Sequence, residues 1–525
     1  MNLFPSILDK KKRKPKKEAT AVEHHRLIKL VEISLERNIE LTELGKYMLG
    51  DDSALSEEKG SKPYLGQAKS SFMDEYLVSR FPLAFLGSRP APETTAIDGE
   101  NLIFIRPSRK SMSYQDHIVE LFKSHILWRM NSSNVVMVFD QPGFKDDPGQ
   151  ILKGPTRKKR YDTNPAKTYP IIDVQLESET HSDWDVVTNK SESRSSYKRL
   201  LARMLMSDVV KGLIPNDRSL TINGVYPDGK TVVVSKRLGD VSVSDGISLK
   251  QSEADTKMYD LAQGQTNLLV SLDIDITLIG VIKQALENDC ASSKRYFIEY
   301  GRVDKKFIDL STLVQQIAQV YSRVPPSRAA ECFVKIFVSL GCDFNPFFKF
   351  LSKARLFELN ESTNPETVFE GPEDFCRLMV TAYEDKYPGI NYTKKNVDPV
   401  EDVSRLRLDL HSRKPSEKAT IPLASVISLQ YKRADVIYSY WTGSLHAMGQ
   451  NATAHIYRNG WEKSKNGEIK LQLVDNTDAL YGFPRNIIKG CGCKIKKVHQ
   501  LFMLQITKWV LQEDMQMYLL QRDPI

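Results

Sequence analysis

The sequence lacks any apolar run that approaches the roughly 20 residues needed to cross a membrane. Its first residues also lack the apolar core of a secretory signal, so we expect no membrane partner. Cysteine is scarce, and the six cysteines do not have the spacing of a disulfide framework, which indicates a reducing compartment. Cys491 and Cys493 have no second Cys/His pair nearby, which argues against a zinc site.

Net charge is also small outside one short segment. The formal charge is +8, and residues 1–17 supply +6 of it through seven basic side chains and one acid. The body of the chain is therefore nearly neutral, and nucleic-acid affinity would have to come from local patches. The basic run 10–17 resembles a nuclear localisation signal, although a disordered arm that touches nucleic acid or a solubilising tail also fits. We favour the import signal and predict a nuclear protein.

At 525 residues the chain is long for a single core, so insertions or a second domain are expected. The composition predicts four segments: a basic disordered arm at 1–19, a helical extension at 20–93, an α/β core at 94–356, and an α+β extension at 357–525. Within the core, residues 141–251 look like a basic, mobile insertion, with an exposed loop over 171–196.

The central stretch 252–280 holds two tight pairs of carboxylates. These are Glu253 with Asp255 and Asp273 with Asp275. Ser252 followed by helix-favouring residues predicts a helix start, and LLVSLD predicts a buried parallel strand that ends at Asp273. A capping box at 252–255 and a helix cap at 273–275 are the structural alternatives.

Two further buried-type strands end in an acid. TTAID ends at Asp98 and NVVMVFD ends at Asp140. Because open α/β sheets gather ligands at the carboxyl ends of their strands, we expect these acids and Asp273 to share one sheet edge. Carboxylates gathered there could not all stay ionised without cations, and a pair of Mg²⁺ ions suits oxygen ligands.

Other elements are predicted from periodicity and turn signals. Helices are expected over 20–49, 67–80, 114–130, 196–213, 310–321, 329–340 and 498–520; a hairpin over 222–235; a strand over 295–301; irregular structure over 357–420; and β-structure over 421–480, with turns at Asn459-Gly460 and Asn466-Gly467.

A basic segment follows Asp140. It contains Lys145, Lys153, Arg157, Lys158, Lys159 and Arg160. Basic side chains that leave an acidic edge would suit the grip of a phosphate backbone, although a solvated loop is also consistent with them.

Taken together, the ordered acids resemble the flap endonuclease family of the 5′-nuclease superfamily, whose sheet-and-helix core is of the PIN type. The motifs in order are AID, VFD, EAD, DID and GCDF. They supply Asp98, Asp140, Glu253, Asp255, Asp273, Asp275 and Asp343. The resemblance covers roughly residues 94–350. It departs from the family before the first strand, where the usual glycine-started segment is absent, and after Asp343, where the glycines of the duplex-binding motif are absent. These departures are similar to those of divergent viral members or 5′→3′ exoribonucleases.

The resemblance implies hydrolysis of phosphodiester bonds by two Mg²⁺ ions, with Mn²⁺ as a possible substitute. It implies Asp98, Glu253, Asp255 and Asp273 as inner ligands and Asp140, Asp275 and Asp343 as outer ligands. Lys153 and Arg157 are counterparts of the family's arch lysine and arginine, although the spacing does not fix which basic residues serve. Lys145, Lys158, Lys159 and Arg160 would contact nucleic acid. Phe104 could be the family's stacking aromatic or a core residue. The expected substrate is DNA with 5′-flaps or related branched ends; an RNase of the same fold and a non-catalytic nucleic-acid-binding factor are the alternatives.

Overall fold

The computed structural model describes most of residues 72–472, together with 58–59 and 62–63. The gaps within this range are 110, 142–143, 145–146, 163–169, 227, 291, 302–304, 322–323, 349–350, 364–369, most of 388–420, 423, 465 and 468. The basic arm, the helix expected over 20–49, the helix expected over 498–520 and Lys145 lie outside the described residues. None of the described helices is long and apolar enough to span a membrane.

The chain divides into two compact units. One unit comprises residues 55–378 and 428–473, and it contains the central sheet and all the charged groups discussed below. The other comprises 1–54, 379–427 and 474–525. Its described part consists mainly of the end of helix α17 (Pro372–Lys386) and the start of helix α19 (Ala424–Thr442).

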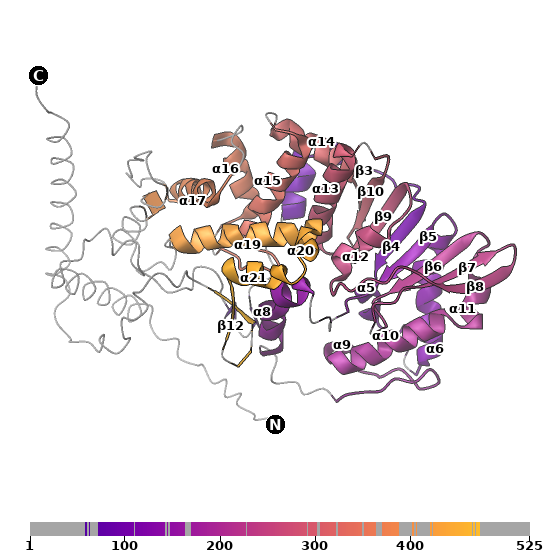
Figure 1. The fold of residues 1–525 in the computed structure, drawn as a ribbon. Coiled ribbons are helices and arrows are strands. Elements are labelled where there is room, and N and C mark those ends of the chain that lie inside the picture. The colour runs from indigo at the N-terminus through magenta and orange to yellow at the C-terminus, as the bar shows by residue number, and fades with distance from the viewer. Residues whose placement is uncertain are drawn as a thin grey trace, which may run out of the picture. The chain divides into compact units, whose positions relative to one another are not determined.

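A mixed sheet of nine strands in the order β3-β11-β10-β9-β4-β5-β6-β7-β8 forms the centre of the larger unit (Figure 1). The strands are β3 (Phe85–Leu86), β4 (Thr94–Asp98), β5 (Asn134–Val138), β6 (Arg218–Asn223), β7 (Val232–Arg237), β8 (Asp240–Asp245), β9 (Thr266–Ser271), β10 (Arg295–Tyr300) and β11 (Lys306–Asp309). The five central strands β10, β9, β4, β5 and β6 are parallel. The strands outside them pair antiparallel. The predicted α/β class is confirmed.

The register of the central strands places their carboxyl ends together. Asp98 of β4 pairs with Val138 of β5, and Ile97 pairs with Val270 of β9. These strands are rich in β-branched residues and mostly buried, as expected for parallel strands covered on both faces. The acids that follow them therefore emerge at one edge.

Helices cover both faces of the sheet (Figure 1). One face carries the continuous helical segment α6 (Tyr114–Leu121), η4 (Phe122–Leu127) and α7 (Trp128–Met130), together with α10 (Ser191–Leu205) and α11 (Asp208–Leu213). The other carries α12 (Ala254–Leu261), α13 (Ile274–Asp289), α14 (Leu310–Val320) and α15 (Pro326–Ser339). Shorter elements are β1 (Glu58–Lys59), β2 (Lys62–Pro63), η2 (Phe72–Leu77), α4 (Val78–Arg80), η3 (Pro82–Ala84) and α5 (Gly99–Ile103).

The prediction of an exposed loop over 171–196 is right for its first half, since residues 171–183 form no helix or strand and are mostly exposed. It was wrong for the second half, which contains α9 (Asp185–Asn189), and Trp184 just before this helix is only 3% exposed. The indole Nε1 of Trp184 donates to the carbonyl of Ile103 at 2.9 Å, which anchors the segment to the core. The segment was predicted to be a loop because most of its residues are polar, and composition does not show that Trp184 is buried. Strands β6, β7 and β8, all within 141–251, extend the central sheet, with the predicted hairpin formed by β6 and β7.

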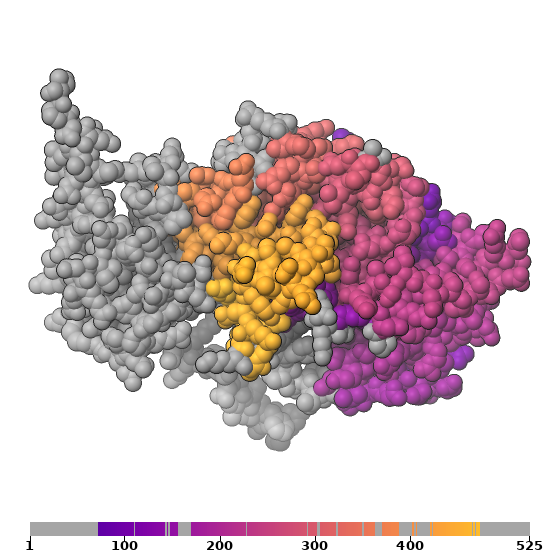
Figure 2. Space-filling view, in the orientation of Figure 1, coloured from indigo at the N-terminus to yellow at the C-terminus, as the bar shows by residue number. Residues whose placement is uncertain are grey.

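Several predictions for the described residues of the carboxyl-terminal third were wrong in secondary structure. Residues expected to be irregular form α16 (Lys353–Thr363) and α17, and residues expected to be β-rich form α19, α20 (Ser444–Ala447) and α21 (Asn451–Arg458). In α19, the buried positions Ala434, Ile437 and Trp441 recur every three or four residues, which is a helical period. Among the described residues of 421–480, only β12 (Trp461–Lys463) and β13 (Ile469–Leu471) pair as a hairpin, and the predicted turn at Asn466-Gly467 lies between them. In Figure 2 the yellow surface of this region adjoins the red surface of the sheet-covering helices.

Candidate metal centre

The structure brings the seven predicted acids to the carboxyl edge of the central strands. Each lies at or shortly after the end of a strand or helix, or at the start of a helix. Asp98 ends β4, Asp140 follows β5, Glu253 and Asp255 open α12, Asp273 and Asp275 open α13, and Asp343 follows α15. The convergence expected from the sequence is therefore present, whereas metal binding by these residues stays a prediction.

Asp98 is held by hydrogen bonds at the start of α5. Its carboxylate accepts from the backbone N–H of Glu100 at 3.0 Å and from Asn101 Nδ2 at 2.9 Å. Burial, followed by the nearby charges of Asp140, Glu100 and Asp273, raises the pKa of Asp98 to about 8. This carboxylate therefore lies in surroundings that disfavour its ionised form unless positive charge is added.

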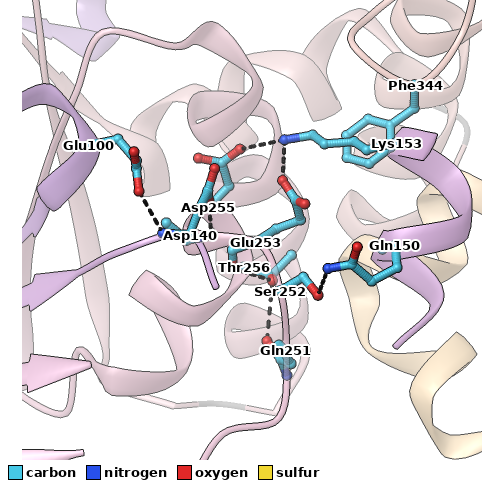
Figure 3. A network of polar contacts seen from close by, with 12 residues as sticks. Glu100, Asp140, Gln150, Lys153, Gln251, Ser252, Glu253, Asp255, Thr256 and Phe344 are labelled. Carbon is cyan, nitrogen blue, oxygen red and sulfur yellow. Dashed lines mark hydrogen bonds and ion pairs between the residues drawn. The ribbon is translucent and has the colours of Figure 1, made fainter. Parts of the chain in front are cut away.

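Asp140 joins β5 to the helix that carries the next acids. Its Oδ1 accepts from the backbone N–H of Ala254 at 2.8 Å, so Asp140 satisfies a free donor at the start of α12. Ser252, expected to begin this helix, does not cap it. Glu253 is the N-cap residue, and Ser252 Oγ instead accepts from Gln150 Nε2 at 2.5 Å (Figure 3).

Lys153 of α8 (Pro148–Asp162) reaches into the acids from the opposite side (Figure 3). Its ammonium forms an ion pair with Glu253 and lies 3.9 Å from Asp255 Oδ2 and 5.0 Å from the ring centroid of Phe344. Burial alone would lower the pKa of Lys153, but Glu253, Asp255 and Asp140 raise it. Lys153 is therefore a fixed cation in this cluster.

Asp255 keeps a raised pKa despite that cation. Burial is the main cause, Lys153 opposes it, and the charges of Asp273, Asp140 and Asp98 add to it. Asp255 therefore experiences the acids of all three strand ends, which defines the cluster as one electrostatic unit.

Asp273, Asp275 and Asp343 form the tightest part of the cluster, with one carboxylate oxygen from each lying within 4.8 Å of the others. Asp273 Oδ1 also accepts from the backbone N–H of Asp275 at 3.1 Å, which caps α13. Asp273 therefore caps α13 and also belongs to the group of three acids. Gly341 brings Asp343 back to the site: its φ of +114° and its close approach to Phe347 leave no room for a side chain.

The donor set matches a hard divalent cation. Every predicted ligand is a carboxylate, and carboxylate oxygens are the ligands that Mg²⁺ takes in proteins. Lys153, Lys198 and Lys257 lie among these acids, yet burial, together with the charges of Asp140, Glu100 and Asp273, still raises the pKa of Asp98. A bound cation would favour the ionised form of Asp98.

The predicted basic and aromatic residues are only partly placed around the cluster. Arg157, Lys158, Lys159 and Arg160 all belong to α8, one to two turns beyond Lys153. Phe104 ends α5 and is 48% exposed, so the interpretation as a core residue was wrong.

Three functional candidates escaped the sequence analysis. Lys198 of α10 pairs with Glu100 and donates to the carbonyl of Asp140 at 3.0 Å. Lys257 of α12 donates to the carbonyl of Phe139 at 2.7 Å, and burial lowers its pKa to about 8. Glu100 and Lys257 each lie two residues after a predicted ligand, Asp98 and Asp255, so their positions in the sequence could have indicated them. Lys198 has no local signal.

The fold and the site together define an α/β protein with a carboxylate cluster at the carboxyl edge of its parallel strands. No known family profile matches the sequence, and no curated protein matches it.

Proposed function

We propose that the protein is a Mg²⁺-dependent nuclease with a PIN-like core that hydrolyses phosphodiester bonds in nucleic acid. The observation that carries the proposal is the meeting of seven acids from separate parts of the chain, with Lys153 paired to Glu253 among them. Structural carboxylates are usually paired singly with cations or capped donors, whereas an excess of acids at a strand edge is typical of metal-dependent phosphoryl chemistry.

The arrangement of strands supports the PIN-like assignment. Five parallel strands with helices on both faces place their acids at the edge where open α/β sheets bind ligands. The acids also follow the order along the chain that the flap endonuclease family uses.

The seven acids are proposed to form an inner and an outer group of ligands. Asp98, Glu253, Asp255 and Asp273 would be the inner ligands of the ions, with Asp140, Asp275 and Asp343 around them. Bound Mg²⁺ would lower the pKa of a water and offset the charge of the scissile phosphate. Lys153 contributes a permanent positive charge beside Glu253, where it would stabilise the charge that develops on the phosphate. Arg157 lies one turn further along the same helix.

The preferred substrate is DNA with a 5′-flap or related branched end. The basic run 10–17 supports work in the nucleus, on replicating, recombining or damaged DNA. RNA of matched sequence is the alternative that the same experiment addresses.

The test is cleavage of end-labelled 5′-flap substrates, in matched DNA and RNA forms, by the full chain with Mg²⁺ and with EDTA. We expect cleavage of the DNA flap that requires Mg²⁺ and disappears in Asp273→Ala. Asp289→Ala, which changes an exposed acid at the other end of the same helix α13, is the matched control and should cleave normally.

Cleavage of RNA alone would favour the RNase alternative. Binding without cleavage of either form would favour a non-catalytic factor. An Asp273→Ala variant as active as the wild type would exclude the acid cluster as the catalytic centre.

A further inference from the structure

A second group of charged side chains lies away from the acid cluster, around the indole ring of Trp128. The guanidinium carbons of Arg89 and Arg129 lie 4.7 and 4.1 Å from the ring centroid, and Lys305 Nζ lies 5.5 Å from it. Oε1 of Glu299 accepts from Arg129 Nη2 at 2.8 Å and lies 2.8 Å from Lys305 Nζ. Within the described part of the chain, three cations therefore surround one carboxylate.

This cationic group belongs to the sheet face that carries α6, α7 and α10. Glu299 of β10 pairs in register with Val270 of β9, and neighbours in register project on the same face. Val270 packs against the core beneath α6 and α10. The group thus lies beside that core and uses none of the seven acids.

Several donors of the group are left unused. Nε and Nη1 of Arg129 and Nε and Nη2 of Arg89 are buried and have no hydrogen-bond partner among the described residues. Arg129 is only 5% exposed. The second oxygen of Glu299 is also without a partner, so this carboxylate does not complete the guanidinium hydrogen bonds. Buried donors and positive charges without partners are costly, which makes a missing acceptor the natural completion of the group.

The electrostatics agree with a deficit of negative charge. Burial lowers the pKa of Arg129 and of Arg89, and Glu299 offsets this only in part. Burial also lowers the pKa of His125, and the charges of Arg129 and Lys305 lower it further. A positive field therefore extends over this part of the face.

We propose that Arg89, Arg129 and Lys305 around Trp128 form a binding site for an oxyanion of the phosphate class. Guanidinium donors match the geometry of phosphate oxygens, and a lysine adds a mobile point charge. Solvent reaches the edge of the group, because Trp128 is 37% exposed and the Lys305 side chain is 40% exposed. Two guanidinium groups already lie over the indole ring, so we expect the ligand to be held by its phosphate and not by base stacking. The phosphate could be part of a nucleic-acid backbone or a free ion.

The experiment titrates the full chain with two probes, inorganic phosphate and a short oligothymidylate, in EDTA at constant ionic strength. The readout is tryptophan fluorescence, with Trp128→Phe to identify the contribution of this ring among the five tryptophans. We expect saturable binding that Arg89→Gln and Lys305→Gln each weaken about tenfold, as for the loss of one charge-assisted hydrogen bond. Lys306→Gln is the matched control, because the neighbouring Lys306 pairs with Asp74 instead.

Binding of both probes in competition would identify a backbone phosphate, and binding of inorganic phosphate alone would identify a free ion; either supports the proposal. Absence of saturable binding, or binding unchanged in Lys305→Gln, would overturn it. Lys305 is partly exposed, so this variant is expected to fold even if Arg89→Gln does not. Because the titration contains no divalent cation and measures no cleavage, its result is independent of the proposed nuclease activity.

Discussion

His446 and Asp147, which are 299 residues apart in the chain, are joined by a hydrogen bond of 3.0 Å between Nε2 and Oδ1. Asp147 directly precedes α8, the helix that carries Lys153. Its second oxygen accepts from the backbone N–H of Ser252 at 2.8 Å, next to Glu253. Helix α20, which carries His446, is therefore connected to both sides of the Lys153–Glu253 ion pair through one buried carboxylate.

Removal of this carboxylate should destabilise the larger unit more than removal of the histidine. Asp147→Ala leaves the Ser252 and Gly149 backbone donors and His446 without their acceptor, so we expect a loss of about 3 kcal/mol in the free energy of unfolding. His446→Ala removes one partner and should cost about 1 kcal/mol. Urea unfolding at neutral pH measures both, with His455→Ala as the control. Equal values for all three variants would contradict this role.

The stability that Asp147 contributes should depend on pH. Burial alone would raise the pKa of Asp147, but hydrogen bonds from His446 and Ser252 lower it below its ordinary value. A depressed pKa in the folded state gives stability that is present above the unfolded value of about 3.9 and is lost as the pH falls through the folded pKa. The difference in unfolding free energy between wild type and Asp147→Asn should therefore shrink as the pH is lowered below about 4. A difference that grows with acidity would exclude this explanation.

Asp98 should show the opposite dependence in the absence of metal. Its folded pKa is raised to about 8, so its contribution is fully present below the unfolded value of about 3.9 and is lost as the pH rises through the folded value. We expect Asp98→Asn in EDTA to be more stable than the wild type, by an amount that increases between pH 5 and pH 8. Denaturant titrations across this range measure it. A pH-independent difference would mean that Asp98 is ionised in the folded protein throughout.

Mg²⁺ should stabilise the fold through the three closest acids. A cation that binds only the folded protein raises the melting temperature with its concentration. Asp343→Asn removes one of three carboxylates within 4.8 Å and should reduce that rise, whereas Asp289→Asn should not. Thermal unfolding with increasing Mg²⁺ measures this without any nucleic acid. An identical rise in Asp343→Asn would place the ion elsewhere.

The acids could be found from the sequence because their signal is local. Asp98, Asp140 and Asp273 each follow a short buried strand, and parallel strands bring such positions to one edge by topology alone. Lys198 could not be found, because it reaches the carbonyl of Asp140 from 58 residues away on a helix of ordinary composition. Only packing of α10 against the sheet reveals it.

The prediction of β-structure over 421–480 was wrong for a different reason. Valine, isoleucine and tyrosine are frequent there and favour strands, so residue preference indicated β-structure. Tertiary contacts decide otherwise: Arg433 of α19 is fully buried and donates to Gln430 Oε1 at 2.7 Å and to the carbonyl of Gly460 at 3.2 Å. The helix is fixed by contacts that residue preferences do not report.

Gly224 should be indispensable for the position of Asp140. It lies just after β6 with a φ of +86°, and a Cβ there would overlap the carbonyl oxygen of Phe139, which precedes Asp140. Gly224→Ala therefore adds a backbone collision to the strain of a left-handed conformation, which alone costs roughly 1–2 kcal/mol. Gly239, in the turn between β7 and β8, has a φ of +92° and open space around its Cα, so Gly239→Ala should show the strain alone.

Comparing Gly224→Ala with Gly239→Ala separates the effect of the backbone collision from that of the left-handed conformation. We expect Gly224→Ala to lose clearly more unfolding free energy than Gly239→Ala, and to lose the Mg²⁺-dependent rise in melting temperature, because Phe139 can move only by displacing Asp140. Gly239→Ala should keep that rise, since β8 lies at the far edge of the sheet from β9. Equal destabilisation of the two variants with unchanged Mg²⁺ response would show that the end of β5 can shift without disturbing the acids.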